Sequence, residues 1–122
     1  MDRADIERRL PVWRAFSGSF LDTQFDDDHH VTSARTIAST PFSLSELEMI
    51  FRRDIGPALA GNLRCVAGEW AGWHDDFLRE RIARSRRNRL SARFRTLGFR
   101  GYIDKEWRKW AHAVTVARTG EG

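Results

Sequence analysis

Apolar residues recur at helical spacing along the whole chain, and this spacing limits the possible folds more than any other feature of the sequence. The clearest case is the stripe of Leu44, Leu47 and Phe51. Ser43 followed by Glu46 matches a capping box and marks the start of this helix. No stretch of convincing length alternates apolar and polar residues as a half-buried strand does. The sequence therefore predicts an all-α fold, a single compact domain of five or six helices.

Prolines and glycines set the expected limits of the helices in the first half of the chain. A first helix should end near Leu21, with Pro11 marking either a kink or the first turn of its main segment. A second helix is predicted over residues 27–39, where acidic residues favour a helix start. Gly56 and Pro57 should interrupt the helix that begins at the capping box, and a short segment should restart with Pro57 in its first turn, where proline is permitted.

Two further helical segments are predicted in the second half. His74 or Asp75 caps the first of these segments. This segment must bend, stop or drift within residues 85–88, because the apolar stripe of its later part lies roughly 100° around the helix from that of its earlier part. Gly98 and Gly101 should end it. The last helix is defined by the apolar stripe of Ile103, Trp107, Trp110, Ala111 and Val114.

The size and composition of the chain suit one domain that needs no metal or disulfide. It has 122 residues, of which 41% are hydrophobic. We expect residues 1–118 to form this domain, with an acidic part over 1–75, an arginine-rich part over 76–118 and a tail over 119–122. Cys65 is the single cysteine, which favours a reducing compartment. No signal peptide and no run of about 18 apolar residues is present, so we expect a cytoplasmic protein without integral membrane association.

The net charge of +4 hides an uneven distribution. Residues 1–75 carry eight arginines and no lysine against twelve acidic residues, a net charge of −4, whereas residues 76–122 carry thirteen basic residues against five acidic ones, a net charge of +8. This asymmetry is typical of a surface directed at an anionic partner. GC-rich coding can also produce such a bias toward arginine without any binding role, although arginine is the better bidentate phosphate ligand.

Nine arginines accompany a single acid, Glu80, between residues 79 and 100. Their mutual repulsion could be relieved by the acidic half of the same chain, by an acidic protein or by nucleic acid. A membrane surface is opposed by the expected core position of Trp107 and Trp110. Trp70 and Trp73 are either core anchors or an exposed recognition pair. The predicted residues for binding a partner or nucleic acid are Arg79, Arg84, Arg86, Arg87, Arg89, Arg93, Arg95, Arg100, Trp70 and Trp73.

Three segments of the chain, FLDTQF, STPFSLSELEMIFRRDIGPAL and GNLRCVAGEWAGW, resemble a family of small bacterial helical proteins of unknown function. The resemblance covers about residues 8–82, and its most specific segment is Ala-Gly-Glu-Trp-Ala-Gly. It implies a bacterial origin and a helical domain, and it brings no activity or site residues with it. The arginine-rich C-terminal third lies outside the matching part.

Candidate metal ligands cluster at the start of the second predicted helix. Asp26 with His29 or His30, and Asp27 with His30, have the spacing that helical ligands need. Acidic side chains at a helix start also interact favourably with the positive end of the helix dipole. We therefore interpret the cluster as a solvated, acid-capped helix start. No metal site is therefore predicted.

Catalytic candidates are few and have ordinary explanations. His74, Asp75 and Asp76 suit helix capping, and Glu69 can cap a backbone group or pair with an arginine rather than act as a desolvated proton carrier. No nucleophile elbow, phosphate-binding glycine loop, zinc-protease helix or Cys/His spacing is present. We predict no catalytic activity and no cofactor.

These observations favour a non-catalytic protein–protein interaction domain, an immunity protein or small adaptor that binds an acidic protein partner. The alternative is a nucleic-acid-binding protein that uses the arginine-rich C-terminal helices. Salt distinguishes the two, since nucleic-acid binding falls steeply as salt rises, whereas a packed protein interface survives moderate salt.

Overall fold

The all-α prediction is confirmed by a computed structural model of the chain, which describes residues 2–18, 27–59, 75–88 and 97–120. Within these ranges every regular element is helical and none is a strand. None of the described helices has the length and apolar character needed to cross a bilayer. The elements are α1 (Arg3–Ser17), α2 (Asp27–Ala38), α3 (Leu44–Met49), the π-helix η2 (Ile50–Ile55), α4 (Gly56–Leu59), α5 (Asp75–Arg87) and α7 (Arg100–Thr119).

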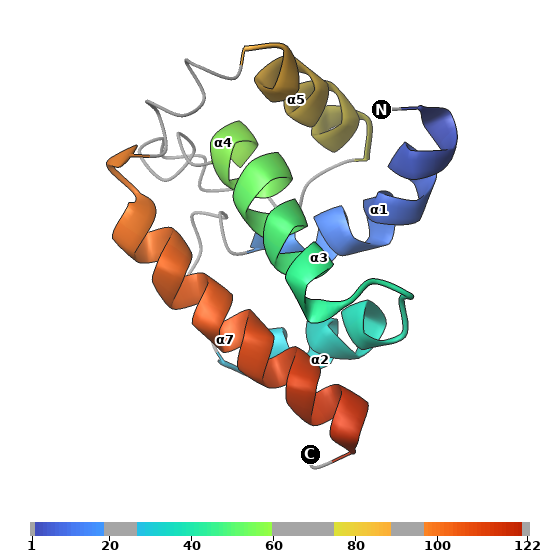
Figure 1. Cartoon of the computed structure of the whole chain (residues 1–122), viewed down its shortest axis with the longest axis vertical. Coiled ribbons are helices and arrows are strands. Elements are labelled where there is room, and N and C mark those ends of the chain that lie inside the picture. The colour runs from blue at the N-terminus through green and yellow to red at the C-terminus, as the bar shows by residue number, and fades with distance from the viewer. Residues whose placement is uncertain (1, 19–26, 60–74, 89–96, 121–122) are drawn as a thin grey trace.

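The helices surround one core (Figure 1). The long helix α7 runs along one side of the molecule, and α2 packs against it. The elements α3, η2 and α4 follow one another as a continuous helical run that crosses the front of the view. Helix α5 lies at the top, where it contacts α1, η2 and α4.

Aromatic rings from three elements form the centre of this core. Phe16 of α1 packs edge-on against Phe51 of η2 at a centroid distance of 5.0 Å and against Trp110 of α7 at 5.2 Å. Trp107 completes the cluster, 6.2 Å from Phe16. Edge-to-face contacts of this kind add to the stabilisation that aromatic burial already provides. The expected core positions of Trp107 and Trp110 are confirmed.

The predicted break at Gly56 and Pro57 is wrong, because η2 continues into α4 without a gap, but the predicted short segment with Pro57 in its first turn is confirmed as α4. Proline has no N–H, and in an α-helix its ring would clash with the carbonyl four residues earlier. Here the preceding turn is π-helical, and the N–H of Gly56 donates to the carbonyl of Phe51. A Cβ at Gly56 would lie 3.3 Å from Cδ1 of Ile103, so the glycine also allows α7 to approach closely.

Other boundaries differ from the prediction by a few residues. Helix α1 ends at Ser17 rather than near Leu21, and α7 begins at Arg100, which places Gly101 inside its first turn. The stop expected within residues 85–88 is confirmed, since α5 ends at Arg87. Helix α2 closely matches its predicted range.

The predicted capping box is confirmed at the start of α3. The Ser43 hydroxyl accepts the Glu46 N–H at 3.1 Å, and the Glu46 carboxylate accepts the Ser43 N–H at 2.9 Å. These bonds from Ser43 hold the pKa of Glu46 below its usual value.

Removal of this cap should destabilise the protein measurably. We expect Ser43→Ala to lower the free energy of unfolding by about 1 kcal/mol, because the first turn loses a backbone partner. Chemical denaturation with Ser45→Ala as the control measures the effect, since Ser45 is exposed in the same turn and has no hydrogen bond of its side chain within the described part of the chain. Equal losses in the two variants would show that the cap does not stabilise α3.

Candidate functional site

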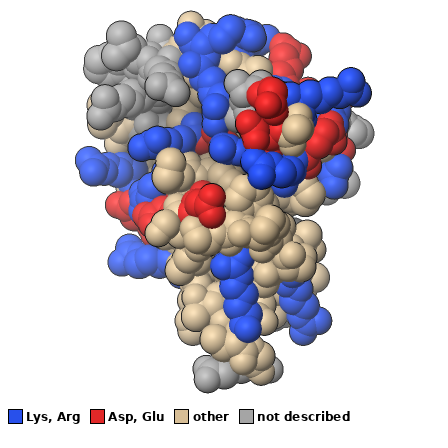
Figure 2. Space-filling view, turned by 45° about the vertical axis from the view of Figure 1, so that its right-hand side comes forward, with Lys and Arg blue, Asp and Glu red and all other residues tan. Residues whose placement is uncertain are grey.

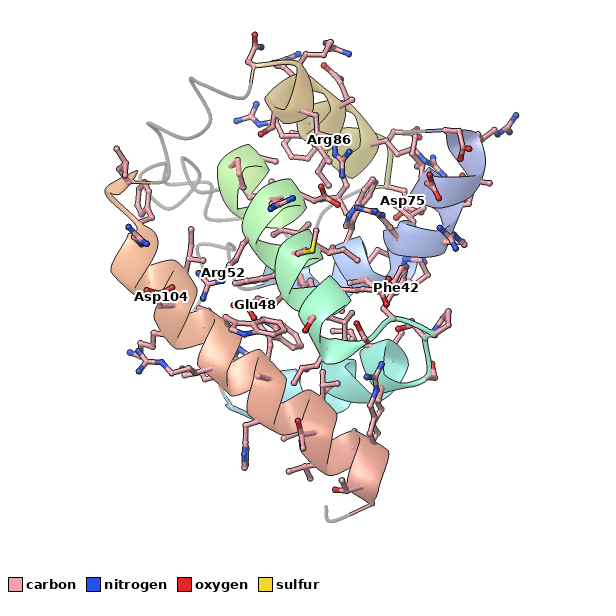
Figure 3. The ribbon with its side chains drawn as sticks, in the orientation of Figure 1. Phe42, Glu48, Arg52, Asp75, Arg86 and Asp104 are labelled. Carbon is pink, nitrogen blue, oxygen red and sulfur yellow. The ribbon has the colours of Figure 1, made fainter. Side chains whose placement is uncertain are left out.

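A buried carboxylate organises the arginine-rich side of the molecule. Asp54 of η2 is only 1% exposed. Its Oδ1 accepts Nη2 and Nε of Arg86 at 2.6 and 3.0 Å, and its Oδ2 accepts Nη1 of Arg9 at 3.0 Å and Nε1 of Trp13 at 3.1 Å. Arg86 makes its bonds from α5, where Figure 3 labels it. Asp54 therefore connects α1, η2 and α5 through charge-assisted hydrogen bonds.

Two further arginines of α5 also form ion pairs within the chain. Arg79 pairs with Glu7 of α1 at 2.9 Å and with Asp76 of its own helix at 3.0 Å. Arg84 pairs with Glu80 at 2.5 Å. Of the alternatives that the sequence left open, internal pairing with the acidic half of the chain is therefore the one observed for Arg79 and for Arg86.

A further ion pair joins α1 and α5, this time with the arginine on α1 and the acid on α5. Arg14 of α1 makes two bonds of 2.7 Å to the carboxylate of Asp75 at the start of α5 (Figure 3). Asp75 is the first residue of α5 and its carboxylate binds Arg14, while His74, the other predicted cap, lies outside the described residues.

Every described acidic side chain is engaged within the chain, whereas several basic ones are not. Every acidic side chain that the structure describes has an ion-pair or helix-capping partner. Six basic side chains are exposed and make no ion pair or hydrogen bond with the described residues. Figure 2 shows basic side chains spread over the upper half of one face, with acidic ones between them. The six exposed basic residues are Arg3, Arg35, Arg53, Arg87, Arg100 and Lys105.

The predicted binding residues therefore separate into two groups. Arg79, Arg84 and Arg86 are engaged internally, whereas Arg87 and Arg100 are exposed. The remaining members of the predicted set lie outside the described residues, and they are Arg89, Arg93, Arg95, Trp70 and Trp73.

A second buried polar pair lies between α2 and α7. His30, 3% exposed, has its Nε2 3.3 Å from Oε1 of Glu106, which is itself 4% exposed. The His30 ring packs on Trp110 at a centroid distance of 4.6 Å. Lys109 Nζ lies 3.5 Å from Oε2 of Glu106. The solvated interpretation is therefore wrong for His30, because packing of α2 on α7 encloses it.

The sequence did contain a signal for both buried acids, and it was missed. Glu106 lies between Ile103 and Trp107 on the apolar stripe of α7, and Asp54 lies on the stripe that Phe51 and Ala58 share. Burying a charged side chain alone is costly. A charged residue on an apolar stripe therefore indicates a residue that is buried together with ion-pair or hydrogen-bond partners. Among the described residues, no group of three or more His, Cys, Asp or Glu side chains could hold a metal ion.

Tyr102 provides a prediction for alkaline solution. It is half-buried, and burial, together with the charge of Glu106, raises the pKa of its phenol from 10.0 to about 12. Between these two values the unfolded chain has lost the phenolic proton while the folded chain keeps it. Stability should therefore fall with rising pH through this window and be unaffected by Tyr102 below it.

The chain contains one tyrosine, so tyrosinate absorbance reports this residue alone. Titration of the folded protein should give a midpoint near 12, and titration in denaturant should give one near 10. A midpoint near 10 in a chain that is still helical by circular dichroism would contradict the buried position of the phenol.

Comparison with known families places the chain. The model of a family described as a domain of unknown function (DUF7079) matches residues 7–116. The chain belongs to this family. The match includes α5 and most of α7, so the DUF7079 domain includes the arginine-rich part that lay outside the resemblance noted from the sequence. No curated protein and no solved structure matches the chain.

Proposed function

We propose that this DUF7079 domain is a non-catalytic interaction domain of a bacterial cytoplasmic protein, of the immunity-protein or small-adaptor kind, that binds an acidic face of another protein. The observation that carries the proposal is the positive charge that remains after internal pairing. Arg53, Arg87, Arg100 and Lys105 are exposed without an acidic partner among the described residues, whereas each described acid is engaged. An acidic protein face would complement this charge and accelerate association.

The engaged arginines support the proposal in a second way. Arg79 and Arg86 hold α5 against α1 and η2, so Arg87 of α5 and Arg53 of η2 project from helices that are joined to each other. A surface held in place loses less conformational entropy on binding than a mobile one does.

Affinity capture tests this function. The tagged protein is incubated with a nuclease-treated lysate of the cells that encode it, at about 0.15 M and then about 0.5 M salt. Over this change the Debye length shortens from about 8 Å to about 4 Å. We expect one protein to remain bound in stoichiometric amount at the higher salt, because packed contacts are weakly screened. A lysate without nuclease treatment is the control.

Two results would contradict the proposal. Nucleic acid bound from the untreated lysate at the lower salt and released at the higher one, with no protein retained from either lysate, would identify a phosphate-binding surface instead. Recovery of no protein and no nucleic acid would show that the exposed basic residues have no macromolecular partner in those cells.

A further inference from the structure

A group of charged side chains lies along the contact between the α3–η2 run and the first half of α7. Arg52 of η2 donates from Nη1 to Oδ1 of Asp104 at 2.6 Å and from Nε to Oε2 of Glu48 at 2.8 Å (Figure 3). One guanidinium therefore serves two carboxylates, one from each side of the contact. These three charges sum to −1, so the group takes its positive charge from the other basic residues near Asp104.

Further basic side chains flank Asp104 along α7. Arg100 and Arg108 stand four residues before and four residues after it, so all three share one face of the helix. Both arginines are exposed, and the Nε of Arg108 donates to the backbone carbonyl of Asp104 at 3.4 Å. The bond from Arg52 holds the pKa of Asp104 below its usual value, and the charges of Arg100 and Arg108 add to this effect.

We define this group as the α7 seam, and it carries net positive charge. Lys105, next to Asp104, is exposed and makes no ion pair with the described residues. Figure 2 shows basic side chains around acidic ones on the left flank of that view. The members of the seam are four basic residues and two acidic ones: Arg52, Arg100, Lys105, Arg108, Glu48 and Asp104.

An exposed apolar side chain lies on the α3–η2 run, about 100° around the helix from Glu48. Met49 directly follows Glu48 and is 49% exposed, one of four large apolar side chains that are exposed in the described part of the chain. Arg53 follows one turn later and is exposed as well. Methionine is flexible and polarisable, and it is common where a surface accommodates apolar groups of a partner.

We propose that the α7 seam is the docking surface for an acidic segment of a protein partner, with carboxylates at Arg100, Lys105 and Arg108 and an apolar side chain on Met49. This inference rests on the proposed function and assigns it a surface. It differs from the sequence prediction, because Arg79, Arg84 and Arg86 of α5 are already paired within the chain.

The mixed charge of the seam favours carboxylates of a protein over the phosphates of nucleic acid. Duplex DNA presents one negative charge for about every 1.7 Å of its axis, so Glu48 and Asp104 would face phosphates at close range. Like charges brought together at an interface oppose binding. A protein segment can instead place its carboxylates beside Arg100 and Arg108 and leave the acidic positions free.

The test measures binding of a fluorescently labelled peptide in which glutamates flank a leucine, by fluorescence anisotropy at about 0.15 M salt. The seam variant carries Arg100→Glu and Arg108→Glu. The matched control carries Arg3→Glu and Arg35→Glu, which change the same charge at exposed positions on α1 and α2. Circular dichroism checks that both variants stay folded.

We expect the seam variant to bind the peptide at least about tenfold more weakly than the original protein, and the control to stay within about threefold, because distant charges are screened at this salt. Met49→Ala should weaken binding about fivefold without any change of charge.

Equal weakening in the seam and control variants would overturn the inference, since only overall charge would then matter. Tighter binding of a labelled DNA duplex than of the peptide would overturn it as well. If affinity capture still recovers a protein with the seam variant in the original amount, the seam is the wrong surface while the proposed function stands. If capture with the original protein recovers nothing, the proposed function fails.

Discussion

Replacement of Asp54 by asparagine is expected to lower the free energy of unfolding by about 3 to 5 kcal/mol, the largest effect of any single polar substitution in the described part of the chain. The carboxylate accepts from Arg86 on one oxygen and from Arg9 and Trp13 on the other. Asparagine keeps one oxygen and replaces the second with an NH₂ group, which has no lone pair for these donors. Either Arg86, or Arg9 together with Trp13, would then face the NH₂ group of the asparagine, so that donors would meet inside the protein without an acceptor.

Chemical denaturation followed by circular dichroism measures this loss. Arg53→Gln is the matched control, because it removes a charge from the adjacent residue of η2, which is exposed and has no partner among the described residues. The control should change stability by less than about 0.5 kcal/mol. A loss below about 1 kcal/mol for Asp54→Asn would show that Asp54 does not hold α1, η2 and α5 together.

Replacement of Trp110 by alanine should be equally damaging, with an expected loss of about 3 to 5 kcal/mol. Its side chain is 0% exposed, and it lies between Phe16 of α1 and His30 of α2 at ring distances of 5.2 and 4.6 Å. Alanine would leave a cavity where three helices meet. The same change would remove the apolar wall beside the pair of His30 and Glu106.

Thermal and chemical unfolding both test this effect. His112→Ala is the control, because His112 is exposed on the same helix two residues later. It should leave stability within about 0.5 kcal/mol of the original value. Comparable losses in the two variants would contradict the position of Trp110 at the centre of the core.

Local features of the fold could be predicted from the sequence. The capping box at Ser43 needs only residues three apart, and the stripe that places Trp107 and Trp110 in the core needs only helical spacing. The π-helix could not be predicted in the same way. It depends on how Pro57 is accommodated while Gly56 packs closely against Ile103 of α7, and no local pattern encodes that contact.

The candidate site was harder to predict because its charge pairs join distant residues. Arg86 and Asp54 are 32 positions apart, and Arg79 and Glu7 are 72 apart. Composition indicated that the acidic half could neutralise the arginine run, but only the packing of α5 on α1 and η2 decides which arginines are engaged. Arg87 differs from Arg86 by one position, about 100° around the helix, and is exposed for that reason.

The division of the arginines into engaged and exposed ones is the central claim, and labelling with a dicarbonyl reagent followed by mass spectrometry tests it most directly. Arg87 and Arg100 should react quickly, whereas Arg86 and Arg9 should be protected by their bonds to Asp54. If Arg86 reacts as fast as its neighbour Arg87 in the folded protein, the buried carboxylate does not engage α5, and the account of which basic residues remain for a partner is wrong.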